Sequence, residues 1–186
     1  MGKSVIFTNG VIAVRENKLL RDKIMRLTEI SAEDAFRSVT ESGFGKGAEA
    51  ENVYDYEKLL VADERELDAF IAEYAPSNAE KAYFLAPRDF HNAKAILKAQ
   101  YLNEPVDGML APDGEITAEE LAATIKSGKL ENLNGHLREA AESCNKLFAE
   151  SDGSVSGAEI GAVFDRALYG YLFSACSKNG FLKKAL

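Results

Sequence analysis

Apolar residues recur every three to four positions along nearly the whole chain, which is the spacing that places them on one face of an α-helix. The pattern is clearest in residues 11–27, 56–74 and 160–172. In the first of these stretches the apolar positions are interleaved with Arg15, Lys18, Arg21, Lys23 and Arg26. No stretch has the sustained apolar–polar alternation and hairpin turns of a β-sheet. The pattern therefore predicts an all-α protein with about seven or eight helices.

Local signals mark where these helices begin and end. At four places a Ser or Thr is followed three residues later by an acid, as in a capping box whose hydroxyl accepts from the third helical amide. These hydroxyl residues are Ser31, Ser77, Thr117 and Ser156. The four prolines, Pro76, Pro87, Pro105 and Pro112, fall between periodic segments, where a helix is expected to stop. The stretch 42–52, SGFGKGAEAEN, is predicted to be a flexible loop.

Length and charge narrow the classes of function. The 186 residues can bury a real core, and their 22 basic and 30 acidic side chains give a net charge of −8. We expect no nucleic-acid binding, because the basic residues are spread along the chain and diluted by Glu and Asp. No apolar run approaches the roughly 18 residues of a membrane-spanning helix. The acidic balance favours solubility or docking on a basic partner.

The cysteines and two acidic stretches are candidate metal ligands, but their spacing does not fit a metal site. The two cysteines, Cys144 and Cys176, lie among small and apolar residues without a metal-ligand spacing, and are expected to be buried free thiols. APDGEITAEEL and ESDGSVSGAEI resemble the second half of a calcium-binding EF-hand loop, which needs oxygen donors at its first and third positions. Those positions hold Met109 and Ala111 in one stretch and Phe148 and Glu150 in the other. A turn followed by a capping box explains both stretches.

A glycine-rich segment also resembles a phosphate-binding loop. Residues 43–47, Gly-Phe-Gly-Lys-Gly, lack the Ser or Thr that must follow the lysine, since Lys46 is followed by Gly47. No β-strand is predicted before them. We therefore interpret this segment as a connector between helices.

Residues 84–102 hold the densest polar cluster of the chain. Asp89, His91, Asn92 and Lys94 are predicted to lie at the start of a helix whose apolar positions continue beyond them. The cluster is either an active site, with His91 acting as a base beside Asp89, or a helix start whose polar side chains satisfy free backbone amides. The second histidine, His136, is a further candidate base. In the structural interpretation, Asp89 caps the helix that it opens, and Asn92 and Lys94 tie neighbouring helix ends or loops together.

The same residues resemble a family signature. Residues 88–98, Arg-Asp-Phe-His-Asn-Ala-Lys-Ala-Ile-Leu-Lys, are similar to the tyrosine–Asp–x–x–Asn–Leu–Lys–x–x–Leu–Arg signature of the C subunit of V/A-type rotary ATPases, called subunit d in the eukaryotic vacuolar enzyme. Asp89, Asn92, Lys94 and Leu97 match position for position. Arg88, Ala93 and Lys98 stand where an aromatic residue, Leu and Arg are usual.

Other stretches extend the resemblance along the chain. Arg15 followed by Leu19 and Leu20 resembles the family's opening helix, and residues 33–45 resemble a segment in which a Thr precedes an aromatic-Gly turn. Residues 56–60 match a helix with an acid and paired leucines. Asp165 and Tyr169 resemble the Asp–x–x–x–Tyr helix that opens the next structural repeat. The order and spacing of these short motifs carry the resemblance.

The resemblance implies a definite architecture. The family is built of helical units arranged with approximate three-fold symmetry into a funnel. Residues 1–150 are then expected to form the first unit and residues 151–186 the start of a second one. The Asp–x–x–Asn signature recurs in the family after the Asp165-type helix, but this sequence stops before a second copy, so we expect it to represent roughly the first half of such a subunit.

The resemblance also implies a function. The protein is expected to be a non-catalytic central-stalk subunit that couples a rotor shaft to the membrane ring in ATP-linked proton or sodium transport. Its partners would be the shaft subunits and the ring, on the cytoplasmic face of the membrane, and neither a catalytic residue nor a cofactor or metal is expected. Two alternatives stay open from the residues alone: a helical scaffold or regulatory module unrelated to rotary ATPases, and a small helical hydrolase using His91 and Asp89.

Overall fold

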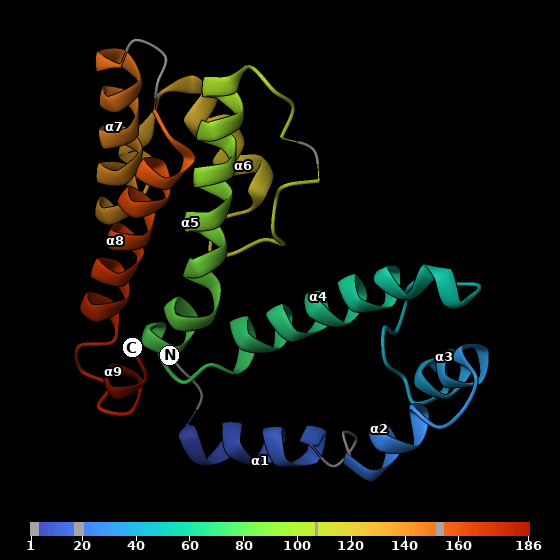
Figure 1. The fold of residues 1–186 in the computed structure, drawn as a ribbon. Coiled ribbons are helices and arrows are strands. Elements are labelled where there is room, and N and C mark those ends of the chain that lie inside the picture. Colours follow the sequence, from blue (N-terminus) through green and yellow to red (C-terminus); the bar gives the residue numbers. More distant parts are fainter. Residues whose placement is uncertain (1–3, 17–20, 107, 152–154) are drawn as a thin grey trace. The chain divides into compact units, whose positions relative to one another are not determined.

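A computed structural model describes residues 4–16, 21–106, 108–151 and 155–186, and over these ranges the chain is all-α, as predicted (Figure 1). The chain forms two compact units, residues 1–77 and 78–186. The first contains α1 (Val5–Glu16), α2 (Arg21–Leu27), α3 (Ala32–Glu41), the 3₁₀ turn η1 (Val53–Asp55) and α4 (Tyr56–Tyr74). The second contains α5 (Asn78–Leu102), α6 (Ala118–Ser127), the 3₁₀ turn η2 (Leu130–Asn132), α7 (Gly135–Glu150), α8 (Gly157–Ala175) and α9 (Leu182–Ala185). The predicted boundary between two structural repeats at residue 150 stays a prediction, because a division into compact units does not show where a repeat begins or ends.

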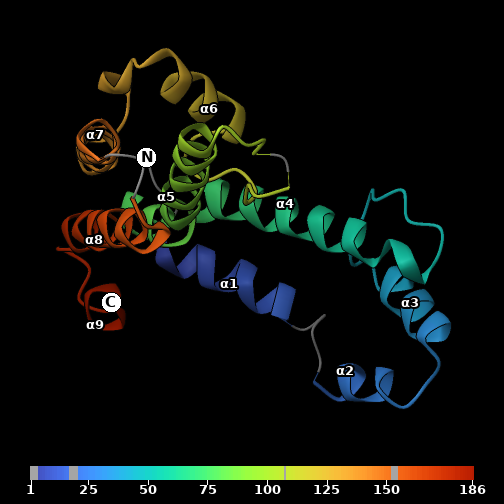
Figure 2. The same cartoon turned by 45° about the horizontal axis from the view of Figure 1, so that its top comes forward.

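The second unit holds a continuous hydrophobic core. Helix α5 packs against α6, α7 and α8, and α7 packs along α8 (Figures 1 and 2). Phe90, Leu97, Leu121, Leu137 and Phe164 are almost fully buried where these helices meet. Close packing of this kind makes an interior stiff. The apolar stripe predicted for 160–172 lies on α8, whose Ile160, Phe164 and Leu172 enter this core.

Capping side chains fix three helix starts where the sequence predicted them. The side chains of Ser31, Thr117 and Ser156 accept hydrogen bonds from the third amide of α3, α6 and α8 respectively. At Ser156 the capping box is complete, because Glu159 accepts in return from the Ser156 amide at 2.8 Å. The hydrogen bonds from Ser156 lower the pKa of Glu159. Helix α4 also begins and ends at the residues that bound its apolar pattern.

The prediction that a helix starts near Asp89 is wrong. Helix α5 begins at Asn78, directly after Ser77, and runs to Leu102 with Pro87 inside it, so Asp89 lies in the middle of the helix and does not cap it. Ala82, Leu85 and Ala86 are buried before the proline, and Phe90 and Ala93 after it. One apolar face thus continues through Pro87, and packing of that face holds the helix together where a local rule predicts a break.

The first unit is joined mainly by contacts between helix surfaces. The start of α1 lies at the end of α4, where the Thr8 hydroxyl donates to the Tyr74 carbonyl at 2.7 Å and the rings of Phe7 and Tyr74 stack. At the other end of α1, Arg15 pairs with Glu66 and lies over the Phe70 ring. The two helices are therefore antiparallel neighbours. Leu59 is the single buried hydrophobic residue that the described part of this unit contributes.

The glycine-rich segment after α3 is a packed turn. Gly43, Gly45 and Gly47 have φ values of +84°, +64° and +89°, which favour glycine. A Cβ at Gly45 would lie 2.7 Å from the Leu59 Cα, so this turn rests directly on α4. The segment joins α3 to η1 and α4, whereas a phosphate-binding loop of this type follows a β-strand and opens a helix.

Cys144 and Cys176 are free thiols and both are buried, as expected. Burial raises the pKa of Cys144 to about 11, so this thiol stays protonated at neutral pH. Within the described ranges, none of the helices combines the length and the apolar character needed to cross a membrane.

Candidate functional site

The signature residues Asp89 and Asn92 form one buried polar patch on α5. They are three positions apart, which puts them on the same face of the helix. Asp89 is 1% exposed and Asn92 is 0% exposed. A polar side chain can be buried at low cost only when its hydrogen bonds are satisfied. The partners of both side chains lie in residues 109–116, the stretch of chain that leads into α6, which we call the 109–116 segment.

Asp89 binds the end of this segment nearest to α6. Its Oδ2 accepts from the Glu115 amide at 3.0 Å and its Oδ1 from the Ile116 amide at 3.2 Å. Burial raises the pKa of Asp89 to about 7; the two amide hydrogen bonds oppose that rise, while the charges of Glu115 and Asp113 add to it. The carboxyl group thus serves as a bidentate acceptor for backbone amides that precede a helix.

Asn92 binds the other part of the segment. Its Oδ1 accepts from the Ala111 amide at 2.8 Å, and its Nδ2 donates to the Ala111 carbonyl at 3.2 Å. An Asn side chain carries both a donor and an acceptor, so it can pair with the N–H and the C=O of one residue in this way. His91 and Arg88 add contacts to the Met109 and Asp113 carbonyls, at 3.0 and 3.1 Å. Four consecutive or near-consecutive side chains of α5 therefore fasten the segment to the helix.

Lys94 and Leu97 extend the cluster toward α8. The Lys94 Nζ lies 3.4 Å from the Asp165 Oδ1, which joins two residues that belong to separate motifs of the sequence. Leu97 is 2% exposed and belongs to the core. Tyr169, one turn after Asp165, is exposed on α8. Arg15 belongs to the first unit, where it binds Glu66, and Leu19 and Leu20 lie outside the described residues.

Three residues that the sequence did not reveal complete the site. Gly114 approaches Asp89 so closely that a Cβ there would overlap the Asp89 Oδ1. Glu115 accepts from the Tyr171 hydroxyl of α8 at 2.9 Å, and burial, followed by Glu115, raises the Tyr171 pKa. The Asp113–Gly114 pair does signal a tight turn. Sequence alone does not indicate that the turn packs on Asp89, which lies 25 residues earlier in the chain.

The arrangement gives Asp89 and His91 no shared chemistry. Residues two positions apart point to different sides of a helix, and here Asp89 is buried while His91 is exposed. Both Asp89 oxygens are occupied by amides, and the His91 ring contacts the Met109 carbonyl. A general base must reach the proton that it abstracts, and its orienting partner must reach the base. These positions favour the structural interpretation over the hydrolase.

Asp113, an acidic residue of the 109–116 segment, also has a structural role. The Asp113 carboxylate accepts from the Ala118 amide at 2.8 Å, in the first turn of α6. Among the described residues, no three His, Cys, Asp or Glu side chains come together as metal ligands would. The second EF-hand-like stretch includes residues 152–154, which lie outside the described ranges.

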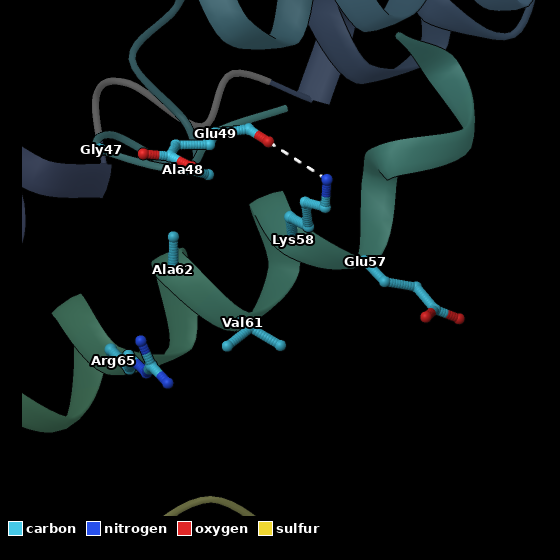
Figure 3. A pocket seen from close by; sticks show the side chains of 8 residues that line it. All are labelled: Gly47, Ala48, Glu49, Glu57, Lys58, Val61, Ala62 and Arg65. Carbon is cyan, nitrogen blue, oxygen red and sulfur yellow. Dashed lines mark hydrogen bonds between the residues drawn. The ribbon is translucent and has the colours of Figure 1, made fainter. Parts of the chain in front are cut away.

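A shallow hollow in the first unit is a weaker candidate. It lies between residues 47–49 and α4 (Figure 3). Lys58 reaches across it to the Glu49 carbonyl at 3.3 Å and also pairs with Asp55 at 2.7 Å. The remaining charged residues of its wall are Glu49, Glu57 and Arg65. Lys58 is thus engaged within the protein, and the balanced charges give the hollow no preference for an anion or a cation.

Comparison with known proteins agrees with the signature. The family model described as ATP synthase (C/AC39) subunit matches residues 8–186. No curated protein and no solved structure gives a significant match to the chain. The family match includes both compact units, with the signature residues of α5 and with Asp165 of α8. The chain therefore belongs to the C/AC39 subunit family of V/A-type ATPases and ATP synthases.

Proposed function

We propose that this chain is a non-catalytic central-stalk subunit that couples the rotor shaft to the membrane ring for ATP-linked proton or sodium transport. One observation carries the proposal: the family's signature side chains are used to fasten elements together. Asp89 and Asn92 hold the 109–116 segment, and Lys94 pairs with Asp165 of α8. A part that transmits torque has to resist deformation, and buried hydrogen bonds within a close-packed core supply that stiffness.

The partners in this proposal are the shaft subunits and the membrane ring, on the cytoplasmic face of the membrane. The net charge of −8 supports docking on basic surfaces of such partners, because complementary charges speed association and fix orientation. Coupling of this kind requires no reaction at the subunit itself. The position of Asp89 supports that point, because its side chain is buried and both of its oxygens are engaged by backbone amides.

Binding to the isolated partners tests the proposal directly. The purified chain is presented to immobilised shaft subunits and, separately, to the detergent-solubilised membrane ring. We expect saturable binding to each, and a ternary complex when all three are mixed. A helical protein of similar size and net charge serves as the control for non-specific association. A folded chain that binds neither partner would contradict the proposal.

Coupling is tested with the assembled machine. A complex depleted of this subunit should hydrolyse ATP without moving ions, and addition of the chain should restore ion uptake into vesicles. The variant Asp89→Ala removes the anchor of the 109–116 segment and should restore less transport per ATP hydrolysed. The variant Lys178→Ala, which alters an exposed charge outside that anchor, should restore transport as the wild type does. Equal transport per ATP with and without the chain would exclude a coupling role.

A further inference from the structure

Helix α1 reverses the usual arrangement of an amphipathic helix. Its contacts with α4 are made by Thr8, the one buried residue of the helix, by Arg15, and by the Phe7 ring, which stacks on Tyr74. Its apolar side chains are largely exposed instead: Val5, Ile6, Phe7, Ile12 and Val14. Figure 2 shows α1 running beside α4. A helix of a soluble protein normally turns its apolar stripe inward and its polar residues toward water.

The exposed side of α1 is more apolar than the solvent-facing side of an ordinary surface helix. Ile6 is 86% exposed and Val14 is 67% exposed, and each lies on the side of α1 away from Thr8. On the described part of α1, the charged residues are Arg15 and Glu16, both at its C-terminal end. Scattered apolar side chains are common on protein surfaces, but five on one twelve-residue helix mark an interaction site.

The charge of the sequence around α1 has the opposite sign from that of the rest of the chain. Residues 1–27 contain six basic and two acidic side chains, a formal charge of +4, whereas residues 28–186 carry −12. Arg26, on α2, is exposed. An apolar helix next to an excess of basic residues is the combination found in segments that bind anionic membrane surfaces.

We propose that α1 is an interfacial helix that lies on a membrane containing anionic phospholipids. In this arrangement Ile6 and Val14 enter the boundary between headgroups and acyl chains, while neighbouring basic residues contact lipid phosphates. Helix α1 is about 18 Å long, too short to cross the hydrocarbon core, so it lies in the interface plane. The contact would hold the first unit at the membrane without any other protein. It goes beyond the coupling function and does not depend on it.

An anionic lipid surface fits α1 better than a protein partner for a physical reason. The exposed residues Ile6 and Val14 occupy the side of the helix opposite α4, and Val5, Phe7 and Ile12 extend onto its flanks, so apolar groups cover most of the circumference. A partner helix would cover one stripe. A lipid interface surrounds everything that sinks into it. The charge of +4 on residues 1–27 is opposite in sign to that of the anionic headgroups. Residues 28–186, by contrast, carry a charge of −12, which favours a basic partner.

Vesicle binding by the full chain tests the proposal. The chain is mixed with vesicles of phosphatidylcholine plus phosphatidylglycerol and with vesicles of phosphatidylcholine alone, and bound protein is measured by flotation. We expect binding to the anionic vesicles, weakened at least roughly tenfold by high salt because salt screens lipid charge. The double variant Ile6→Glu/Val14→Glu should lose roughly tenfold or more of the affinity, since both substitutions place an acid in the interface.

A matched variant separates this effect from a change of net charge. Phe84→Glu/Phe181→Glu also replaces two exposed apolar residues by acids, but in the second unit, and should retain most of the binding. Circular dichroism checks that both double variants stay helical. Equal losses in the two variants, or no binding to anionic vesicles, would overturn the proposal. So would self-association of the chain that Ile6→Glu/Val14→Glu abolishes, because α1 would then bind a second copy.

Failure here is distinguishable from failure of the coupling function. The vesicles contain no shaft or ring subunits, and the partner-binding measurements contain no anionic lipid. A chain that binds shaft and ring but not vesicles keeps its proposed function and loses the lipid contact. A chain that binds vesicles through α1 but neither partner retains only the lipid contact.

Discussion

At Gly114 the main chain passes so close to Asp89 that no side chain fits between them. A Cβ at this position would overlap the Asp89 carboxylate oxygen and would lie 2.8 Å from the Leu85 carbonyl oxygen. Both groups belong to α5, one as a buried side chain and the other as backbone, so neither can move freely. Glycine is required here by close approach.

The variant Gly114→Ala should therefore be strongly destabilised. We expect the free energy of unfolding to fall by about 2–4 kcal/mol, as for other changes that overfill a packed site or break a buried hydrogen bond. Urea denaturation followed by circular dichroism measures the change. Gly161→Ala is the control: nothing lies within 4 Å of a Cβ at that position of α8, so the substitution should stabilise by about 0.5–1 kcal/mol. If Gly114→Ala left the free energy of unfolding unchanged, the segment would not be in close contact with Asp89.

The Asp89 carboxyl gives the second unit a specific pH dependence. Its pKa of about 7 in the folded state lies above the ordinary value of 3.8, chiefly because of burial. The folded state therefore holds this proton more tightly than the unfolded state. Its contribution to stability is fully present below pH 3.8, declines as pH rises, and is lost above pH 7.

We expect the wild type to lose up to roughly 4 kcal/mol between about pH 4 and pH 8 relative to Asp89→Asn, since each pKa unit corresponds to about 1.4 kcal/mol. The asparagine does not titrate, so the variant should have a flatter profile. Unfolding free energies measured across this range give the comparison. Parallel profiles would mean that Asp89 keeps an ordinary pKa in the folded protein.

At the scale of single elements, the chain follows local rules at most helix ends and breaks one inside a helix. Ser31, Thr117 and Ser156 cap the helices predicted from the sequence, because capping depends only on residues three positions apart. The sequence around α5 predicts two helices, one after Ser77 and one near Asp89, because local rules give Pro87 more weight than the apolar positions on both sides of it. Packing between distant elements, which local rules do not include, joins them into one helix.

Pro87 should consequently cost stability where it stands. Replacement by Ala restores an amide that can donate within α5 and removes the ring from the helix interior, so we expect stabilisation of about 1–3 kcal/mol. Thermal and urea unfolding measure it. Pro105→Ala provides the contrast, because in a loop the proline restricts the unfolded chain, and its loss should destabilise by up to about 1 kcal/mol. A less stable Pro87→Ala variant would show that the ring itself is needed at this turn of α5.

Sequence reasoning locates the candidate site but gives only part of its structure. Asp89, Asn92 and Lys94 follow from their spacing on a helix, and Asp165 from a separate motif. That Lys94 meets Asp165, and that Asp89 meets Glu115 and Ile116, depends on how α5, α8 and the 109–116 segment pack. Contacts between residues so far apart in the chain follow from the tertiary fold, and no local pattern in a single sequence encodes them.

At the scale of the whole molecule, the two units differ in how they are stabilised. The buried cluster runs from Ala86 to Leu172 and lies entirely within residues 78–186. Within its described residues, the first unit buries one hydrophobic side chain, Leu59, and leaves many apolar groups exposed on α1, α2 and α4. Burial of apolar surface is the dominant favourable contribution to folding. The stability of the chain should therefore reside in the second unit.

A fragment of residues 78–186 is expected to fold alone and to unfold in one cooperative transition. Its free energy of unfolding should match that of the intact chain within about 1 kcal/mol, because the buried hydrophobic cluster lies within these residues. Residues 1–77 alone should show helical signal without a cooperative transition, since helices that bury little apolar surface are marginal in water. Urea titrations of both fragments and of the intact chain, followed at the helix and tyrosine signals, measure this. If residues 78–186 failed to fold, or if residues 1–77 unfolded as sharply as the intact chain, the buried cluster of the second unit would not account for the stability of the chain.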